Sequence, residues 1–162
     1  IHQGRSEVGP RALGNRSIIF DPRLSNGKEI VNTVKKREEF RPFAGSVLEE
    51  HAGEWFDMIG LERSPFMTFN LRVNSDKRER IPAITHADGT CRIQTVNRKD
   101  NLNYYNLIKA FYDETGVPIL LNTSFNLAGQ AIVENVKQSL KTLSNSNLDY
   151  VYFPDVKMLV EN

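Results

Sequence analysis

Hydrophobic positions recur along the chain with two spacings, and these predict an alternation of strands and helices. Apolar runs at 17–20 and 118–122 predict buried strands. Apolar residues three and four positions apart predict amphipathic helices at 28–34, 103–115 and 136–143. Alternating strands and helices are typical of an α/β or α+β domain.

The less regular middle of the chain predicts a hairpin. Residues 83–86 and 91–96 are expected to pair across an Asp-Gly turn at 88–89, a common hairpin sequence. Pro42 disfavours helical geometry in Arg41, so the charged run after the first helix is expected to end in extended chain. The other expected elements are a helical turn at 10–14, a short helix at 49–58, and strands at 66–73, 150–153 and 157–160.

The composition describes one globular domain. The chain of 162 residues, 40% of them hydrophobic, is long enough to bury a core of its own. Cys91 is the single cysteine, which excludes an internal disulfide and a Cys-based zinc site and points to a reducing compartment, the cytoplasm. No apolar stretch approaches the roughly 18 residues of a membrane span, so no membrane partner is expected. Because Ile1 leads directly into a dense polar string at 4–11, we expect a piece of a longer polypeptide whose preceding part is missing.

The net charge of +1 conceals a segregation of charge along the chain. Residues 1–41 carry +4, 42–62 carry −5, 63–99 carry +5 and 100–162 carry −3. A nearly neutral chain argues against the broad basic face of a nucleic-acid-binding protein. Positive blocks separated by negative ones indicate cations gathered at one local site, which suits a small anionic ligand better than a duplex.

Three cations follow the first predicted helix. Lys35 and Arg37 are two positions apart, so their side chains point the same way in extended chain, and Arg41 can then close over a polyanion such as a triphosphate. The alternative is a solvated basic helix end next to Glu38 and Glu39, which is a common surface feature.

Two further segments carry candidate chemistry. Arg92 lies in the expected hairpin, flanked by Cys91 and Ile93, where a surface residue or the partner of a buried carboxylate is the alternative interpretation. The polar run at 122–126 directly follows the apolar strand at 119–121, and ligands of open α/β sheets bind at the carboxyl ends of strands. An Asn/Ser-rich turn that satisfies its own backbone is the alternative there.

No metal site and no covalent nucleophile are predicted. His86 has no second histidine at ligand spacing, so it is expected to be a structural hydrogen-bonding residue. Cys91 is expected to be a small buried residue. A Gly-x-Ser-x-Gly nucleophile motif does not occur. The candidate chemistry therefore rests on the cations and the polar run.

Four sequence blocks, in order along the chain, resemble the carbamoyltransferases of the nodulation and antibiotic-tailoring type (NodU/CmcH). They are Gly-Arg-Ser-Glu-Val-Gly-Pro-Arg-Ala-Leu-Gly-Asn-Arg-Ser-Ile at 4–18, Lys-x-Arg-Glu-x-Phe-Arg-Pro-Phe-Ala at 35–44, Pro-Ala-Ile-Thr-His-x-Asp-Gly-Thr-x-Arg-x-Gln-Thr-Val at 82–96, and Leu-Leu-Asn-Thr-Ser-Phe-Asn at 120–126. The resemblance extends over nearly the whole chain.

The resemblance implies a domain organisation. Residues 22–162 resemble a YrdC-like C-terminal domain, an open twisted mixed sheet with flanking helices. Residues 1–21 are then the tail of a missing N-terminal domain similar to the actin-like sugar-kinase superfamily. Iron is expected only in that missing domain, which would be the partner of this one in the same chain.

The resemblance also implies a reaction. Carbamoyl phosphate is converted to carbamate, which attacks the α-phosphorus of ATP to give carbamoyl-adenylate and pyrophosphate, with Mg²⁺ accompanying the nucleotide. The carbamoyl group then passes to a hydroxyl or amine acceptor in the other domain. Two other classes stay open: a nucleic-acid-binding module and a purely structural domain that docks against its partner.

The residues that match the YrdC-like pattern are Lys35-x-Arg37 and Ser124-Phe125-Asn126. Adenylate formation brings together two anions, and fixed cations stabilise the charge that develops without a covalent nucleophile. The resemblance implies catalytic roles for Lys35, Arg41, Arg92 and Ser124. It implies nucleotide binding by Lys35, Arg37, Arg92, Asn122, Ser124 and Asn126.

Overall fold

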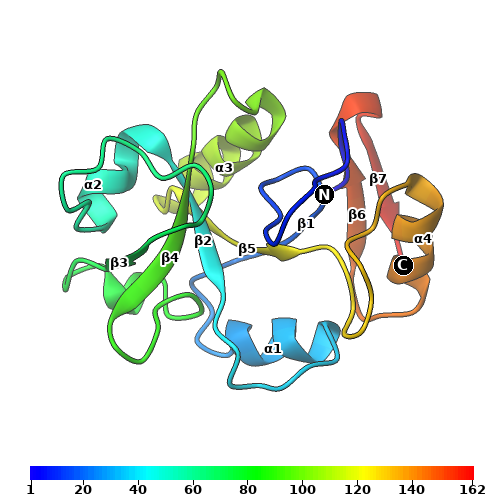
Figure 1. The fold of residues 1–162 in the computed structure, drawn as a ribbon, viewed down its shortest axis with the longest axis horizontal. Helices are drawn as coiled ribbons and strands as arrows, with labels where there is room; N and C mark the ends of the chain where they lie inside the picture. The colour runs from blue at the N-terminus through cyan, green and yellow to red at the C-terminus, as the bar shows by residue number, and fades with distance from the viewer.

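The fold, seen in a computed structural model that describes all of residues 1–162, contains two sheets and four helices (Figure 1). The larger sheet has five strands in the order β1-β5-β2-β4-β3. Its strands are β1 Ser17–Phe20, β2 Ala44–Leu48, β3 Asn70–Arg72, β4 Thr90–Val96 and β5 Ile119–Ser124. The smaller sheet is the antiparallel pair β6 Tyr150–Phe153 and β7 Met158–Glu161. The predicted α/β class and open mixed sheet are confirmed.

The helices predicted at 28–34, 103–115 and 136–143 all form, and the last two have side-chain caps. The helices are α1 Gly27–Val34, α2 Ala52–Trp55, α3 Leu102–Thr115 and α4 Val136–Ser144, with single 3₁₀ turns at Glu49–His51, Arg78–Arg80 and Pro154–Val156. The Asn101 side chain caps α3 by accepting from the Tyr104 N–H, and Gly116 ends the helix in the left-handed conformation. Asn135 and Gln138 form a reciprocal capping box on α4. None of these helices is long and apolar enough to cross a membrane.

The strand directions decide which residues share an end of the sheet. β2 runs parallel to β4, whereas β5 runs antiparallel to β2 and to β1. The carboxyl end of β5, at Ser124, therefore lies at the same end of the sheet as the amino ends of β2 and β4. Arg92 and Asn122 both pair in register with Ala44, so they belong to one row across the sheet.

The central sheet is buried on both faces. Leu121 belongs to the larger hydrophobic cluster, with Val31 of α1, whereas the adjacent Leu120 belongs to a second cluster, with Tyr104 and Ile108 of α3. Because neighbouring strand residues point to opposite faces, α1 and α3 cover the two sides. This explains why β5 is an uninterrupted apolar run from Ile119 to Leu121.

The expected hairpin is wrong in its first arm. Gly89 does occupy a turn, with a φ of +77°, but residues 83–84 form a turn and residues 85–86 belong to no strand. β4 instead pairs with β2 on one side and with β3 on the other. The Asp-Gly turn describes only local chain reversal, whereas the partners of a central strand are chosen by burial of its two apolar faces. The strand expected at 66–73 is likewise limited to β3.

The expected helical turn at 10–14 is also absent. This segment lies on the sheet, and its backbone is satisfied by side chains: Asn122 donates to the Ala12 carbonyl and Glu7 accepts from the Leu13 N–H. Gly14 has a φ of +106°, and any Cβ there would overlap the ring of Tyr104. The glycine therefore serves close packing against α3 and does not end a helix.

Residues near the start of the chain contact both sheets. Arg16, only 3% exposed, donates to the Gln3 carbonyl, and the His2 N–H donates to the Tyr152 carbonyl of β6. Val8, by contrast, is fully exposed. A domain boundary near residue 21 stays a prediction, and β1 on its N-terminal side is a strand of the present sheet.

Candidate functional site

The ammonium group of Lys35 lies at the carboxyl end of β5. Lys35 directly follows α1, and its side chain is only 3% exposed. Its Nζ donates to the Ser124 carbonyl at 2.5 Å, to the Asn126 carbonyl at 3.0 Å and to Asn126 Oδ1 at 3.0 Å. The predicted Lys35, Ser124 and Asn126 therefore meet in space, although they are far apart in sequence.

Ser124 and Asn126, which bind the Lys35 ammonium, are also hydrogen-bonded to each other and to the next loop. Ser124 Oγ donates to Asn126 Oδ1 at 2.6 Å, and Asn126 Nδ2 donates to the Gln130 carbonyl at 2.7 Å. Ser124 and Asn126 thus hold the lysine in place with neutral oxygen atoms. Burial, followed by the positive charge of Arg37, lowers the pKa of Lys35 to about 7. The lysine is poised between its charged and neutral forms near neutral pH.

Lys35 opens onto a polar cavity of about 680 Å³. The residues around it come from the loop after α1 and from the loop after β5. They are Lys35, Lys36, Arg37, Glu38, Arg41, Ser124, Asn126, Leu127, Ala128 and Gly129. Four cationic residues and one carboxylate line the cavity, although the Lys36 ammonium is bonded to the Asn145 carbonyl, so the lining has the electrostatics of an anion-binding site.

Arg37 is held by a polar contact and an aromatic ring. Its Nε donates to Asn32 Oδ1 at 2.6 Å, and its guanidinium lies 4.5 Å from the centroid of the Phe43 ring. Burial and the nearby charge of Arg41 lower the pKa of Arg37, with a smaller contribution from Arg92. Arg37 has no carboxylate partner, so its charge is available to a ligand.

Asn32 is a site residue that was not predicted from the sequence. It lies inside α1 and is fully buried. Its Nδ2 donates to the carbonyls of Glu39 and Arg41, both at 3.0 Å, while its Oδ1 holds Arg37. One buried amide therefore organises the whole loop at 37–41. A polar residue next to the apolar positions of a predicted helix was the sequence feature that could have indicated this role.

Residues 35–37 turn back after α1, so Lys35 and Arg37 are not aligned by extended chain. Lys36 adopts the left-handed conformation, with a φ of +54°, and the Lys36 N–H donates to the Thr33 carbonyl. Arg41 lines the cavity from an exposed position and pairs with Glu38 at 2.8 Å. The cations converge because the chain turns back. The i, i+2 spacing predicted correctly that they lie close together, but extended chain is not the cause.

Arg92 occupies the same end of the sheet but does not line this cavity. It is part-buried without an ion pair, and its Nε has no hydrogen-bond partner. Burial, followed by the charge of Arg11, lowers the pKa of Arg92. An unpaired, part-buried guanidinium is costly, and this cost marks Arg92 as a candidate ligand contact.

Asn122 lies on the sheet and away from the Lys35 cavity. It is 1% exposed, and its Nδ2 donates to Ser46 Oγ at 2.9 Å and to Gln94 Oε1 at 3.1 Å. Asn122 Oδ1 has no hydrogen-bond partner. Arg92 Nε and Asn122 Oδ1 are therefore a buried donor and a buried acceptor without partners, in the same row of the sheet and on the face that carries residues 12–14.

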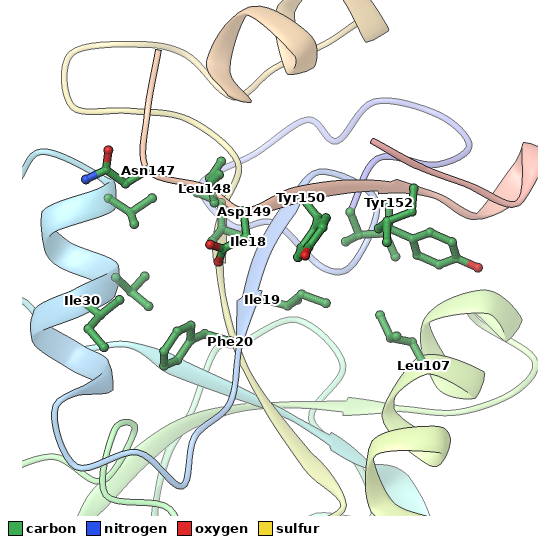
Figure 2. A pocket seen from close by; sticks show the side chains of 14 residues that line it. Ile18, Ile19, Phe20, Ile30, Leu107, Asn147, Leu148, Asp149, Tyr150 and Tyr152 are labelled. Atoms are coloured by element: carbon green, nitrogen blue, oxygen red, sulfur yellow. The ribbon is translucent and has the colours of Figure 1, made fainter. Parts of the chain in front are cut away.

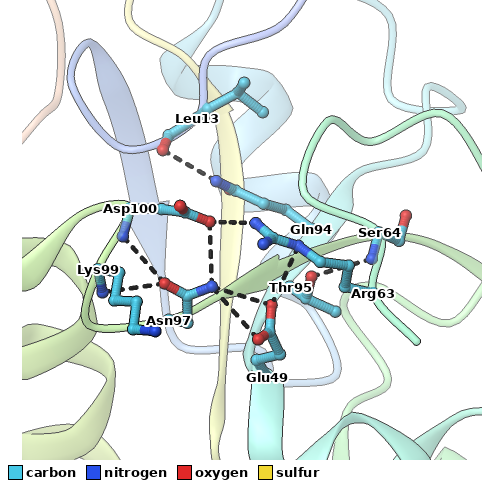
Figure 3. A network of polar contacts seen from close by, with 9 residues as sticks. All are labelled: Leu13, Glu49, Arg63, Ser64, Gln94, Thr95, Asn97, Lys99 and Asp100. Atoms are coloured by element: carbon cyan, nitrogen blue, oxygen red, sulfur yellow. Dashed lines mark hydrogen bonds and ion pairs between the residues drawn. The ribbon is translucent and has the colours of Figure 1, made fainter.

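Figure 3 shows the polar contacts of Gln94, which lies two residues after Arg92 on β4. Gln94 Nε2 donates to the Leu13 carbonyl at 2.9 Å, which fixes the loop above the sheet. Nearby, Arg63 pairs with Asp100 and, at 3.5 Å, with Glu49. Arg63 is neutralised there, so it adds no free charge to the site.

Two structural predictions at single residues are confirmed. His86 Nε2 bonds the Phe43 carbonyl at 2.9 Å, which fits the expected structural role. Cys91 is completely buried, and burial raises the pKa of its thiol to about 12.

The chain contains no cluster of three or more His, Cys, Asp or Glu side chains arranged to hold a metal ion.

Comparison with known proteins identifies the family. Residues 1–159 match the family described as "Carbamoyltransferase C-terminus". The chain belongs to this carbamoyltransferase family. It is 52% identical over 149 residues to Nodulation protein NolO of Bradyrhizobium diazoefficiens, a match that covers 91% of this chain and 27% of NolO.

Other relatives of the carbamoyltransferase domain show the same partial coverage. Nodulation protein NolNO of Sinorhizobium fredii is 52% identical over 149 residues, which cover 91% of this chain and 22% of that protein. Nodulation protein U of Rhizobium tropici is 39% identical over 127 residues, which cover 78% of this chain and 22% of that protein. The chain thus spans about a quarter of the length of the curated relatives it matches.

Proposed function

We propose that this carbamoyltransferase domain binds ATP and carbamoyl phosphate or carbamate and forms carbamoyl-adenylate. The observation that carries the proposal is the buried Lys35 ammonium, fixed by Ser124 and Asn126 at the edge of a cavity of about 680 Å³ that also holds Arg37 and Arg41. Such a cavity suits the charge of a triphosphate.

The reaction balances without a covalent nucleophile on the protein. Carbamoyl phosphate and water give carbamate and phosphate. A carbamate oxygen then attacks the α-phosphorus of ATP, a new P–O bond forms, and the bond to the departing pyrophosphate breaks. Negative charge develops on the oxygens of the α-phosphorus and on pyrophosphate, and preorganised cations stabilise both.

The structure supports distinct roles for the cavity residues. Lys35 supplies a compact charge whose position is set by four oxygen contacts. Arg37 and Arg41 supply planar guanidinium groups that can bind phosphate oxygens in pairs. Ser124 and Asn126 act as positioning residues for Lys35, because their side-chain oxygens are already engaged with it and with each other.

Arg92 and Asn122 support a second contact point in this proposal. A carbamoyl group carries both an acceptor oxygen and a donor amine. Arg92 Nε and Asn122 Oδ1 are complementary to these two groups, but both atoms are buried, so residues 12–14 would have to move aside for a substrate to reach them. We therefore assign the face of residues 12–14 to the carbamoyl end of the substrates and the Lys35 cavity to the phosphates.

Mg²⁺ would enter this site bound to the phosphates of the nucleotide and not to protein carboxylates. Glu38 is the single carboxylate around the cavity, and it already pairs with Arg41. The phosphate oxygens and water would therefore hold Mg²⁺, whose charge would assist departure of pyrophosphate. An iron site and the carbamoyl acceptor are assigned to an N-terminal domain outside residues 1–162.

A calorimetric titration tests the proposal. ATP should bind residues 1–162 with Mg²⁺, and Lys35→Met should weaken the binding while the control Lys137→Met, at an exposed position of α4, should not. The domain should also release pyrophosphate when carbamoyl phosphate is added. Equal ATP affinity in all three proteins contradicts the assignment of the cavity. Binding of duplex DNA or RNA with a steep salt dependence, and without ATP binding, would favour the nucleic-acid alternative.

A further inference from the structure

The two sheets are separated by an apolar slot. A cavity of about 460 Å³ lies between β1 and β6, and Figure 2 shows Ile18, Ile19 and Phe20 facing Tyr150 and Tyr152 across it. Ile30 of α1 and Leu107 of α3 lie on opposite sides of the cavity. Twelve of its fourteen lining residues are hydrophobic, so an open slot would expose apolar surface that a folded protein normally covers.

The edges of both sheets are open along this slot. β1 is the outermost strand of the larger sheet, and Ser17 already exchanges backbone hydrogen bonds with Ile1 on its outer side. Alternation along a strand turns the N–H and C=O of Ile19 to the same outer side. On β6, the Tyr152 carbonyl accepts from the His2 N–H, so Tyr150 also turns its backbone groups into the slot.

Residues 1–3 already occupy one end of this slot. They run antiparallel to the start of β1, with a bridge between His2 and Arg16, and they also bond to β6. Ile1 lines the cavity and is 6% exposed. Extending this strand backwards from Ile1 leads directly along Ile18, Ile19 and Phe20, and therefore into the slot.

We propose that the residues preceding Ile1 in the longer protein form a β-strand that fills this slot and joins the two sheets into one. The proposal is independent of the nucleotide chemistry. It is consistent with the curated relatives, in which most of the length lies outside the matched region. The occupant is this segment of the same chain, because residues 1–3 already set its direction and register.

The register makes the proposal specific. The second residue before Ile1 exchanges two backbone hydrogen bonds with Ile19, and the first donates to the Tyr150 carbonyl. The new strand runs antiparallel to β1 and parallel to β6. Ile19 and Ile1 belong to the cluster under α3, so the second residue faces Leu107, while the first and third face Ile30 of α1. All three are apolar, because both sides of the slot are apolar.

Amide hydrogen exchange on the longer chain tests the register. The Ile18 amide, which faces β5, is the internal reference, and the Ile19 amide faces the slot. We expect the Ile19 and Tyr152 amides to exchange as slowly as the Ile18 amide. Exchange of Ile19 at least about a hundredfold faster than that of Ile18 would overturn the proposal, because it would leave the edge of β1 open.

A pair of matched variants of the longer chain tests the packing. Ile30 and Leu140 are both on helices and are 36% and 38% exposed in residues 1–162, but only Ile30 lines the slot. We expect Ile30→Glu to lower the thermal midpoint several times more than Leu140→Glu, because the strand covers Ile30. Equal shifts in the two variants would show that nothing apolar covers the slot.

Discussion

The Nζ atom of Lys35 lies 3.0 Å from Oδ1 of Asn126, a residue 91 positions further along the chain. This contact joins the end of α1 to the turn that follows β5. It also explains how a lysine that is 3% exposed can point into a polar cavity, because neutral oxygens replace the water that burial removes.

We expect Lys35→Met to lose nucleotide binding and to keep the fold. Methionine retains most of the buried aliphatic volume and removes only the ammonium. A lost charge-assisted contact corresponds to about 1.5–3 kcal/mol, or roughly ten- to a hundredfold in Kd. Calorimetry and the thermal midpoint are measured in parallel. If Lys35→Met also unfolds the domain, its loss of affinity does not report on the charge. Asn126→Ala is therefore measured as well, because it loosens Lys35 without removing it. This variant should lose less affinity than Lys35→Met.

The pKa of Lys35, about 7, predicts opposite pH trends for binding and stability. An anionic ligand favours the protonated lysine, so triphosphate affinity should fall as pH rises from 6 to 9. Between pH 7 and 10 the unfolded chain holds a proton on this lysine that the folded chain does not, so this group makes the folded state more stable as pH rises. Both trends should diminish in Lys35→Met, and a pH-independent affinity in the parent protein would contradict the shifted pKa.

Asn126→Asp should move the pH profile upwards. A carboxylate at this position lies beside the ammonium and raises the pKa of Lys35. The added negative charge also cancels the field of the cavity, so ATP affinity at pH 6 should be lower than in the parent. A titration across pH separates the two effects. An unchanged midpoint would show that the contact with Asn126 does not control the lysine.

Arg92→Met should slow the reaction without reducing stability. The Arg92 guanidinium is part-buried and its Nε has no partner, so the substitution removes an unsatisfied donor. Arg72→Met is the control, since Arg72 is an exposed residue of the neighbouring strand β3. We expect carbamoyl phosphate-dependent pyrophosphate release to fall at least about tenfold in Arg92→Met alone. Equal rates in the two variants would exclude Arg92 from the site.

Gly14→Ala should be strongly destabilising. The alanine Cβ would overlap the Tyr104 ring, and the φ of +106° is unfavourable for any L side chain. A loss of about 3 kcal/mol is expected from the combined strain and steric overlap. Gly53→Ala, in α2, where a Cβ would meet nothing beyond its own helix backbone and flanking residues, is the control and should not be destabilising. A mild effect at Gly14 would show that residues 10–14 are not packed against α3.

The sequence by itself determined the elements whose signals are local. The helix at 103–115 is read from its apolar spacing and from Gly116, and β5 from its uninterrupted apolar run, because both depend on residues within a few positions. The motif resemblance also identified Lys35, Ser124 and Asn126, which the structure brings together.

Only the tertiary structure decided the pairing of β4, the turn that brings Arg37 and Arg41 together, and the separation of Arg92 from the Lys35 cavity. These features depend on contacts between distant segments, and local spacing does not specify which segments meet. The pKa of Lys35 has the same origin. Its value is set by the loss of water and the position of Arg37, and both exist only once α1 packs against the end of β5.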